Sequence, residues 1–253
     1  MKNSAIWFLF LGVSAIRSCL TLSNVWHLEV DLLLALDTST QNTGIALYDY
    51  PVIVGELTWR TANHHTVELA PAVMDLMRRC MVKPAELKAI AVALGPGSFT
   101  SLRIGLALAK GLALALNLPI IGIPTFEYLV AAQPIAAEPL LAVLPAGRTR
   151  MAVQQFSAES GSWLAADEPS VMTPEEISER VAGPTRICGE MNIEERQIIG
   201  RKWKNAMITS PALATRRPSM LAELAWRRWD AGEVDDPILL SPIYLHVAGM
   251  IQE

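Results

Sequence analysis

The chain has 253 residues, of which 51% are hydrophobic and 18% are charged, and its formal net charge at pH 7 is −4. This length and composition are typical of a globular chain that buries a core of its own, and they argue against a disordered one. The negative charge argues against a protein that grips nucleic acid by itself, because such binding depends on clustered Lys and Arg. Any contact with RNA is therefore expected to be indirect.

The first 31 residues are expected to lie outside the folded domain. Lys2 and the apolar run AIWFLFLGVSAI have the charge and length of a signal peptide core, which is too short to span a bilayer as a helix. The next residues, RSCLTLSN, lack a clear cleavage site. We therefore expect a non-native start or a poorly ordered extension over 1–31, with an export or membrane signal as the alternative. The domain is predicted to begin near Leu32.

The first half of the chain predicts an α/β unit. Apolar runs of strand length, parted by a turn at Asp49 to Pro51, predict an antiparallel meander, and a change to helical spacing predicts a helix that ends before Pro84. The next strand, helix and strand predict a crossover between parallel strands. These elements are expected at 32–39, 43–50 and 51–60 (strands), 67–79 (helix), 87–95 (strand), 99–116 (helix) and 118–123 (strand).

The second half partly repeats this pattern. Two strands are expected around the turn at Pro145 to Gly147, followed by a helix in TPEEISERV, where Thr173, Pro174 and Glu176 form a strong helix-start signal. A strand at RICG and helices at 193–202 and 218–229 complete the chain. We expect an N-terminal lobe over 32–132 and a smaller C-terminal lobe over 133–253 that pack closely, since no flexible linker separates them.

One loop has the residue types of a phosphate or magnesium site. Asp37 ends the first predicted strand and is followed by Thr38, Ser39 and Thr40. Carboxylate oxygens bind magnesium, while hydroxyls and backbone amides bind phosphate. The alternative is a turn in which these side chains satisfy their own backbone. A second loop, GPGSFT, opens the helix at 99 but matches neither common nucleotide-binding glycine pattern.

Other reactive side chains form no convincing set. His64 and His65 are adjacent, His27 and His246 stand alone, and a zinc site needs about three convergent ligands. The three cysteines suggest neither a disulfide framework nor a metal site, and there is no G-x-S-x-G elbow. The sequence therefore predicts no catalytic residue and no metal ligand.

The predicted helix at 99–116 is apolar on every side and carries a single lysine. Such a helix must be covered on more than one side. We expect its own sheet, the helix at 67–79 and a second protein to cover it, with the small residues Ser101, Gly105 and Ala109 allowing another helix to approach. The alternative is that this stripe packs only against the chain's own sheet.

Four stretches make the chain resemble the TsaB (YeaZ-type) family of the bacterial tRNA threonylcarbamoyladenosine machinery. The resemblance is dense over about 32–132, and its most specific part is GPGSFT-x-x-RIG. The stretches are LLALDTSTQNTGIALYD, HHTVELAPAVMDLM, AVALGPGSFTSLRIGLALAKGLALALNLPIIGIPTFEYL and PIYLH.

The resemblance implies a fold and a set of partners. The fold is an actin-like (ASKHA, ribonuclease H-like) pair of lobes with mixed sheets flanked by helices. The role is that of a non-catalytic, cytoplasmic subunit that pairs through its first two helices with a TsaD-type transferase, joined by a TsaE-type ATPase, with no membrane partner. The complex modifies an adenosine beside the tRNA anticodon. Homodimer formation through the same helices is an open alternative.

The resemblance implies a specific set of interface or interface-supporting positions on the two helices. They are Val73, Met77, Ser98, Phe99, Leu102, Arg103, Gly105, Leu106 and Ala109. No cofactor is expected for this chain alone, whereas ATP or ADP with magnesium at the complex interface is left open. An insertion of bulk or charge at the centre of such an interface is expected to cost about 2–5 kcal/mol of binding free energy.

Some residues depart from the pattern of the catalytic relatives and of the family. Residues 124–128 offer no imidazole where the catalytic relatives carry paired histidines, Ser101 replaces a usual glycine, and LPAGRTRMAV replaces a usual acidic hairpin. The runner-up hypothesis is an independent ASKHA-type phosphotransferase that holds a magnesium nucleotide on Asp37 and the Thr38–Thr40 loop. A peptidase is a weaker alternative, because no triad or metal-ligand set supports it.

Overall fold

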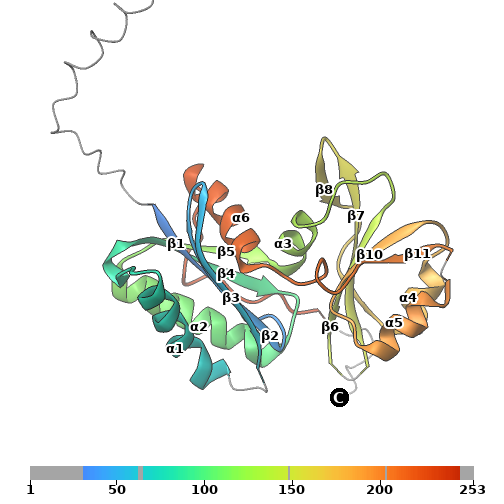
Figure 1. Cartoon of the computed structure of the whole chain (residues 1–253), viewed down its shortest axis with the longest axis horizontal. Helices are drawn as coiled ribbons and strands as arrows, with labels where there is room; N and C mark the ends of the chain where they lie inside the picture. The colour runs from blue at the N-terminus through green and yellow to red at the C-terminus, as the bar shows by residue number, and fades with distance from the viewer. Residues whose placement is uncertain (1–30, 62–64, 148, 203, 246–253) are drawn as a thin grey trace, which may run out of the picture. The chain divides into compact units, whose positions relative to one another are not determined.

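The computed structural model describes residues 31–61, 65–147, 149–202 and 204–245. Two mixed β-sheets flanked by helices form its architecture (Figure 1), so the predicted α/β class with two lobes is confirmed. The expected N-terminal extension, apart from Asp31, lies outside the described residues, as do His27, His64 and His246.

The first sheet has the strand order β3-β2-β1-β4-β5. Its first three strands form the predicted antiparallel meander, and β4 and β5 extend it in parallel from β1. The strands are β1 (Leu32–Asp37), β2 (Asn42–Asp49), β3 (Val52–Arg60), β4 (Leu87–Gly95) and β5 (Ile120–Pro124). β1 is buried at every position, and β4 at most of its positions, because both faces of the sheet are covered.

Helices α1 (His65–Arg79) and α2 (Phe99–Leu116) cover one face of this sheet (Figure 1). Alternate strand residues such as Leu34 and Ile90 pack there with Leu106 and Ala109 of α2. A short 3-10 turn, η1 (Pro84–Glu86), leads into β4. The predicted crossover from β4 through α2 to β5 is confirmed, since β4 and β5 are parallel neighbours.

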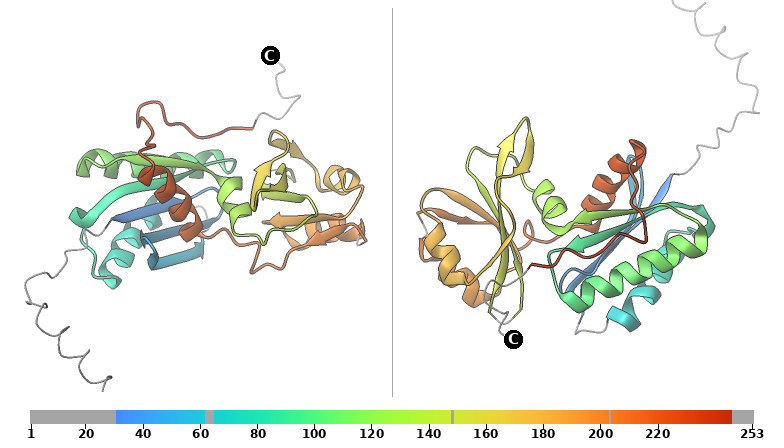
Figure 2. Two further views of the ribbon diagram at one scale, coloured as in Figure 1. Left: turned by 90° about the horizontal axis from the view of Figure 1, so that it is seen from above. Right: turned by 180° about the vertical axis from the view of Figure 1, so that it is seen from behind.

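The last helix, α6 (Pro218–Asp230), covers the opposite face of the first sheet (Figure 2). Leu221, Ala222 and Ala225 of α6 pack against strand residues that include Ala35 and Ala91. The assignment of the whole stretch 133–253 to the second lobe is therefore wrong for this helix. The physical reason is that a sheet with apolar side chains on both faces needs two covers, and chain order alone does not say which segment returns to supply the second.

The second sheet has the order β11-β10-β6-β7-β8, with β9 paired to β7. α4 (Pro174–Arg180) and α5 (Ile193–Ile199) flank it, and Thr173 and Glu176 form the predicted capping box at the start of α4. A 3-10 turn, η2 (Gly200–Lys202), follows α5. The strands are β6 (Leu140–Pro145), β7 (Met151–Glu159), β8 (Ser162–Ala165), β9 (Ser170–Met172), β10 (Thr185–Gly189) and β11 (Ala206–Ile208).

A short helix that the sequence did not predict, α3 (Thr125–Ala131), links the two lobes. Tyr128 packs into the core between the first sheet and α6, whereas Phe126 and Leu129 pack into the core of the second sheet. The boundary between residues 132 and 133 therefore lies just after a helix that belongs to both cores, and it stays a prediction.

α2 lies close to the sheet because small residues, among them Ser101, Gly105 and Ala109, form part of its inward-facing surface. Gly105 faces Thr38 in the loop after β1, and a Cβ atom added at Gly105 would lie 2.2 Å from Thr38 Oγ1. Thr38 is buried, and its hydroxyl donates a hydrogen bond to Ser101 O at 2.7 Å, so it cannot move away without losing that bond. Gly111, on the opposite side of α2, has no atom within 4 Å of such a Cβ.

These two glycines make a matched pair for a stability test. We expect Gly105→Ala to lower the free energy of unfolding by about 1–3 kcal/mol through overpacking. Gly111→Ala should raise it by about 0.5–1 kcal/mol, because Ala restricts the unfolded chain and favours a helix. Urea unfolding followed by circular dichroism measures both changes. An equal effect of the two substitutions would contradict the close contact between α2 and the loop after β1.

Candidate functional site

The Asp37 loop lies buried between β1 and β2, and its polar atoms are used inside the protein. Ser39 N donates to Asp37 Oδ1 at 2.9 Å, as in a turn that satisfies its own backbone. The Thr38 hydroxyl is bonded to Ser101 O, and Ser39 Oγ lies 2.8 Å from Thr125 Oγ1. Of the two interpretations of this loop, the contacts favour the structural turn.

The second oxygen of Asp37 is paired with an arginine that the sequence did not point to. Arg216 Nε donates to Asp37 Oδ2 at 2.8 Å, and a second nitrogen of the same guanidinium donates to Glu190. The side chains of Arg216 and Asp37 are only 1% and 2% exposed. Burial by itself would lower the pKa of Arg216, but the two carboxylates outweigh it and hold that pKa above its usual value. The arginine is therefore charged in the folded protein.

This pairing bears on whether the residues fit a magnesium nucleotide. The carboxylate that would bind the metal is already neutralised by a guanidinium, and the neighbouring hydroxyls are engaged. Within the described ranges, no group of three or more His, Cys, Asp and Glu side chains gathers to hold a metal ion. The residues around Asp37 thus do not fit the metal-bound nucleotide of the phosphotransferase hypothesis.

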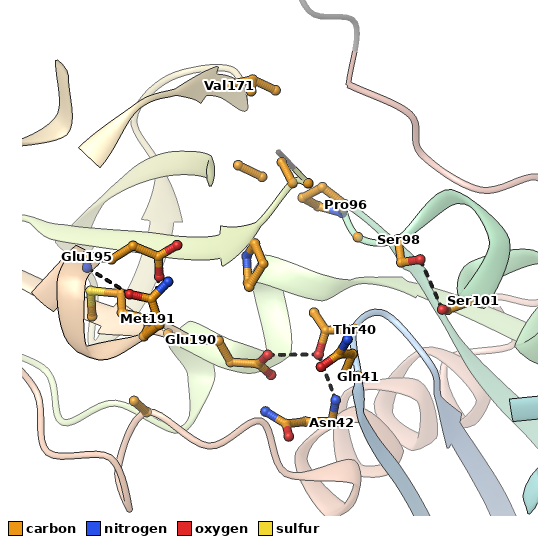
Figure 3. Close-up of a pocket in the computed structure, with 18 of the residues that line it drawn as sticks. Thr40, Gln41, Asn42, Pro96, Ser98, Ser101, Val171, Glu190, Met191 and Glu195 are labelled. Atoms are coloured by element: carbon orange, nitrogen blue, oxygen red, sulfur yellow. Dashed lines mark hydrogen bonds between the residues drawn. The ribbon is translucent and has the colours of Figure 1, made fainter. Parts of the chain in front are cut away.

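A cavity of about 1050 Å³ lies beside this ion pair, between the starts of α2 and α5 (Figure 3). Thr40, Asn42 and Glu190 line it on one side, and Ser98 and Ser101 at the start of α2 line it on another. The GPGSFT turn packs against the Asp37 loop, because Ser98 N donates to Ser39 O at 2.7 Å and a Cβ at Gly97 would lie 2.2 Å from the same oxygen. The Ser98 amide of this turn is therefore used for packing.

Most of the interface positions that the resemblance implied are buried within this chain. Val73 and Met77 of α1 face the core under that helix, and Leu102, Gly105, Leu106 and Ala109 face inward from α2. These six residues can therefore support an interface only from beneath it, and their place in one stays a prediction. The stripe of small residues lets α2 approach its own sheet, which was the alternative interpretation, and leaves no room on that side for another helix.

The three remaining interface positions lie at the exposed start of α2, next to a segment from the C-terminal part of the chain. The ring of Phe99 lies 4.8 Å from that of Tyr244, and the Arg103 guanidinium lies 3.8 Å above the Phe99 ring. Arg103 Nε also donates to Tyr244 OH at 2.8 Å. Phe99 and Arg103 therefore anchor the chain's own segment, while Ser98 is exposed at the mouth of the cavity.

The exposed apolar surface of the helix pair lies on other residues, which we call the outer face. On α2 these residues follow Arg103 at helical spacing, on a different side of the helix from Ser101, Gly105 and Ala109. The helical period of the sequence therefore contains the signal that identifies them. Half-buried Ile104 and Leu108 of α2 pack against the core. The outer face consists of Val67, Ala70 and Met74 of α1 and of Ala107, Gly111 and Leu114 of α2.

α2 is long and apolar enough to cross a membrane, judged by length and composition alone. A third of its residues are buried inside the protein, and they pack on the first sheet. Its apolar residues therefore fall into two groups, an inner stripe that the fold covers and an outer face that none of the described segments covers.

His65, considered as a metal ligand from the sequence, is buried at the start of α1. Its Nδ1 lies 3.0 Å from Thr43 Oγ1, and its Nε2 has no hydrogen-bond partner among the described residues. Burial lowers the pKa of His65, and the charges of Glu68 and Asp37 only partly oppose this. The neutral imidazole is thus the form that the fold accommodates.

This histidine predicts a pH dependence of stability. Because its pKa is lowered by folding, its contribution is complete above about pH 6.5, its usual pKa, and is lost as the pH falls below that value. The free energy of unfolding of the wild type should therefore fall more between pH 7.5 and pH 5 than that of His65→Gln, which has no proton to gain. Parallel pH profiles for the two proteins in urea unfolding would show that His65 does not titrate in this way.

Comparison with known proteins places the chain in a family. The family model described as "TsaD: tRNA N6-adenosine threonylcarbamoyltransferase" matches residues 58–196, more than half of the chain. The "tRNA threonylcarbamoyladenosine biosynthesis protein TsaB" of Bacillus subtilis (strain 168) is 41% identical over 99 residues, which cover 39% of this chain and 43% of the relative. The protein of the same description from Escherichia coli (strain K12) is 30% identical over 152 residues, which cover 59% of this chain and 65% of the relative.

A solved structure extends this likeness over the fold. The structure described as "YeaZ from Pseudomonas aeruginosa" superposes with a TM-score of 0.69 at 27% identity, covering 85% of this chain and all of that one. The sequence matches themselves span less than two thirds of the two curated relatives. The architecture of two mixed sheets flanked by helices is therefore shared with a YeaZ structure. The chain belongs to the TsaD family of tRNA N6-adenosine threonylcarbamoyltransferase and, within that family, is a TsaB/YeaZ-type protein.

Proposed function

We propose that this chain is a non-catalytic subunit in tRNA threonylcarbamoyladenosine biosynthesis and that its outer face binds a TsaD-type catalytic subunit. The observation that carries the proposal is the exposed apolar surface of α1 and α2. Met74 is 57% exposed and Leu114 is 84% exposed, on two neighbouring helices. Exposed apolar groups gathered on one surface mark a binding site for another protein.

The kind of partner follows from the shape of this surface. Two helices that lie side by side on a sheet present ridges and grooves that a second helix pair can match. The family model that matches this chain carries the name of the transferase, so a TsaD-type chain is a related fold with helices of the same kind to offer. A second copy of this chain could use the same face, and a homodimer in the absence of the transferase is the competing occupant.

The proposed roles of the tRNA, the ATPase and the nucleotide are argued from the net charge of the chain and from the ion pair of Asp37. With a net charge of −4, the chain is suited to leave the tRNA contacts to its partner. Asp37 is held in an ion pair, which supports a non-catalytic role. We place the TsaE-type ATPase, and any ATP or ADP with magnesium, on the assembled complex in the cytoplasm. The phosphotransferase and peptidase alternatives have no supporting side-chain set among the described residues.

Substitutions on the outer face test this proposal. Met74→Glu and Leu114→Glu should each weaken binding to a purified TsaD-type protein about 30-fold or more, because a charge at the centre of an apolar contact costs about 2 kcal/mol or more. Isothermal titration calorimetry measures the affinity, and thermal unfolding should be unchanged because both side chains are exposed. Ile193→Glu is the matched control, since Ile193 is 78% exposed but lies on α5 of the second sheet.

The outcomes separate the possible occupants of the surface. Sedimentation of the chain alone shows whether the wild type forms a homodimer that Leu114→Glu dissociates. Wild-type affinity of Met74→Glu and Leu114→Glu for the TsaD-type protein would show that the outer face is not its binding site. A loss of affinity in Ile193→Glu alone would move the interface to the second lobe.

A further inference from the structure

Arg216 lies on the segment that returns from the second sheet to the first. It follows β11, the edge strand of the second sheet, and comes two residues before α6, which covers the first sheet. Asp37 ends β1 in the first sheet, and Glu190 directly follows β10 in the second. The guanidinium that bonds both carboxylates therefore connects the two lobes through side chains, from a third segment that passes between them.

Nearly every donor of this guanidinium is used in that connection. Besides the two carboxylates, it donates to Thr40 Oγ1 at 3.1 Å and to Asn42 O at 2.7 Å. Thr40 Oγ1 in turn donates to Glu190 Oε2 at 2.8 Å, which is a second bond between the lobes (Figure 3). The other oxygen of Asp37 accepts a hydrogen bond from Ser39 N, so both oxygens of this carboxylate have partners.

Because these charged groups are buried, breaking their ion pairs is unfavourable. Arg216 and Asp37 are almost fully buried, and the Glu190 side chain is only 14% exposed. Removing one partner of a buried charge pair leaves a charge without compensation, which is unfavourable in a medium that cannot solvate it. Moving the lobes apart would separate Glu190 from Arg216 and Thr40, so the buried charges oppose that motion.

We propose that Arg216 is a permanent latch that holds the two lobes together and takes the position at which a magnesium nucleotide would otherwise meet Asp37. The positive charge that a metal ion would bring to this carboxylate is supplied by the chain itself. The two lobes then keep one arrangement around the cavity whether or not a nucleotide is present. This inference concerns the cleft and does not depend on which protein binds the outer face.

The lobes are also joined by other contacts, so breaking the latch should loosen the cleft without unfolding the protein. α3 packs into the cores of both sheets. The segment after α6 crosses the first sheet at Ile120 and Leu94, and Leu245 packs against the core of the second sheet (Figure 2). The readout must therefore report on the two loops rather than on global stability.

Hydrogen exchange of the full-length chain, followed by mass spectrometry, tests the latch. Glu190→Gln keeps the shape of the side chain but removes the charge on the second lobe, and Arg216→Met removes the guanidinium. Either change should speed amide exchange about tenfold or more in peptides covering 37–42 and 189–192, while β1 and β6 exchange as in the wild type. If Arg216→Met does not fold, Glu190→Gln decides, because its side chain is at the margin of the network.

Two matched controls and one ligand complete the test. Glu195→Gln lies at the same cavity but keeps its capping bond within α5, and Arg217→Met removes an arginine whose partner, Glu56, is on the first sheet. Both should exchange as the wild type does in the two loops, and 5 mM magnesium ATP should leave those loops unchanged. Wild-type exchange in Glu190→Gln, or protection of 37–42 by magnesium ATP, would overturn the proposal.

Discussion

The close approach of α2 to the first sheet decides which surface this protein has left to offer. Gly105 and Ala109 bring the helix against the sheet and against the Asp37 loop, so the small residues face inward. Leu102 and Leu106 face inward with them, whereas Leu114 lies on another side of the helix, where it is 84% exposed and none of the described segments covers it. An apolar surface left in this way by the packing of the core is what a partner subunit can bind.

Local signals in the sequence were enough for much of the fold. The meander, the β4–α2–β5 crossover and the capping box at Thr173 each depend on neighbouring residues, and each was predicted. The place of α6 was not, because its apolar face fits either lobe and the choice is made by the long-range fit of alanines on the sheet. α3 was missed because seven residues give too short a period to distinguish a helix from a buried turn.

The sequence indicated the two helices of the candidate interface, but it did not indicate which of their sides is exposed. The importance of the two helices came from a resemblance and from periodicity, yet choosing their outer side required knowing which stripe meets the sheet. Arg216 could not be found from the sequence, since it lies 179 positions from Asp37 and no local pattern links them. The outer face belongs to the first lobe, and the proposed Arg216 latch fixes the position of that lobe relative to the second. Such an arrangement suits a subunit that presents a preformed surface to its partner.

The most direct test of the outer face is oxidative footprinting of methionine side chains, with and without a TsaD-type protein. Met74 lies on the outer face, whereas Met207 lies on β11 of the second sheet and is 36% exposed. The account predicts that complex formation slows oxidation of Met74 about tenfold or more, as expected for a side chain that becomes buried at an interface, and leaves Met207 unchanged. Equal oxidation of Met74 in the free and bound protein would contradict it.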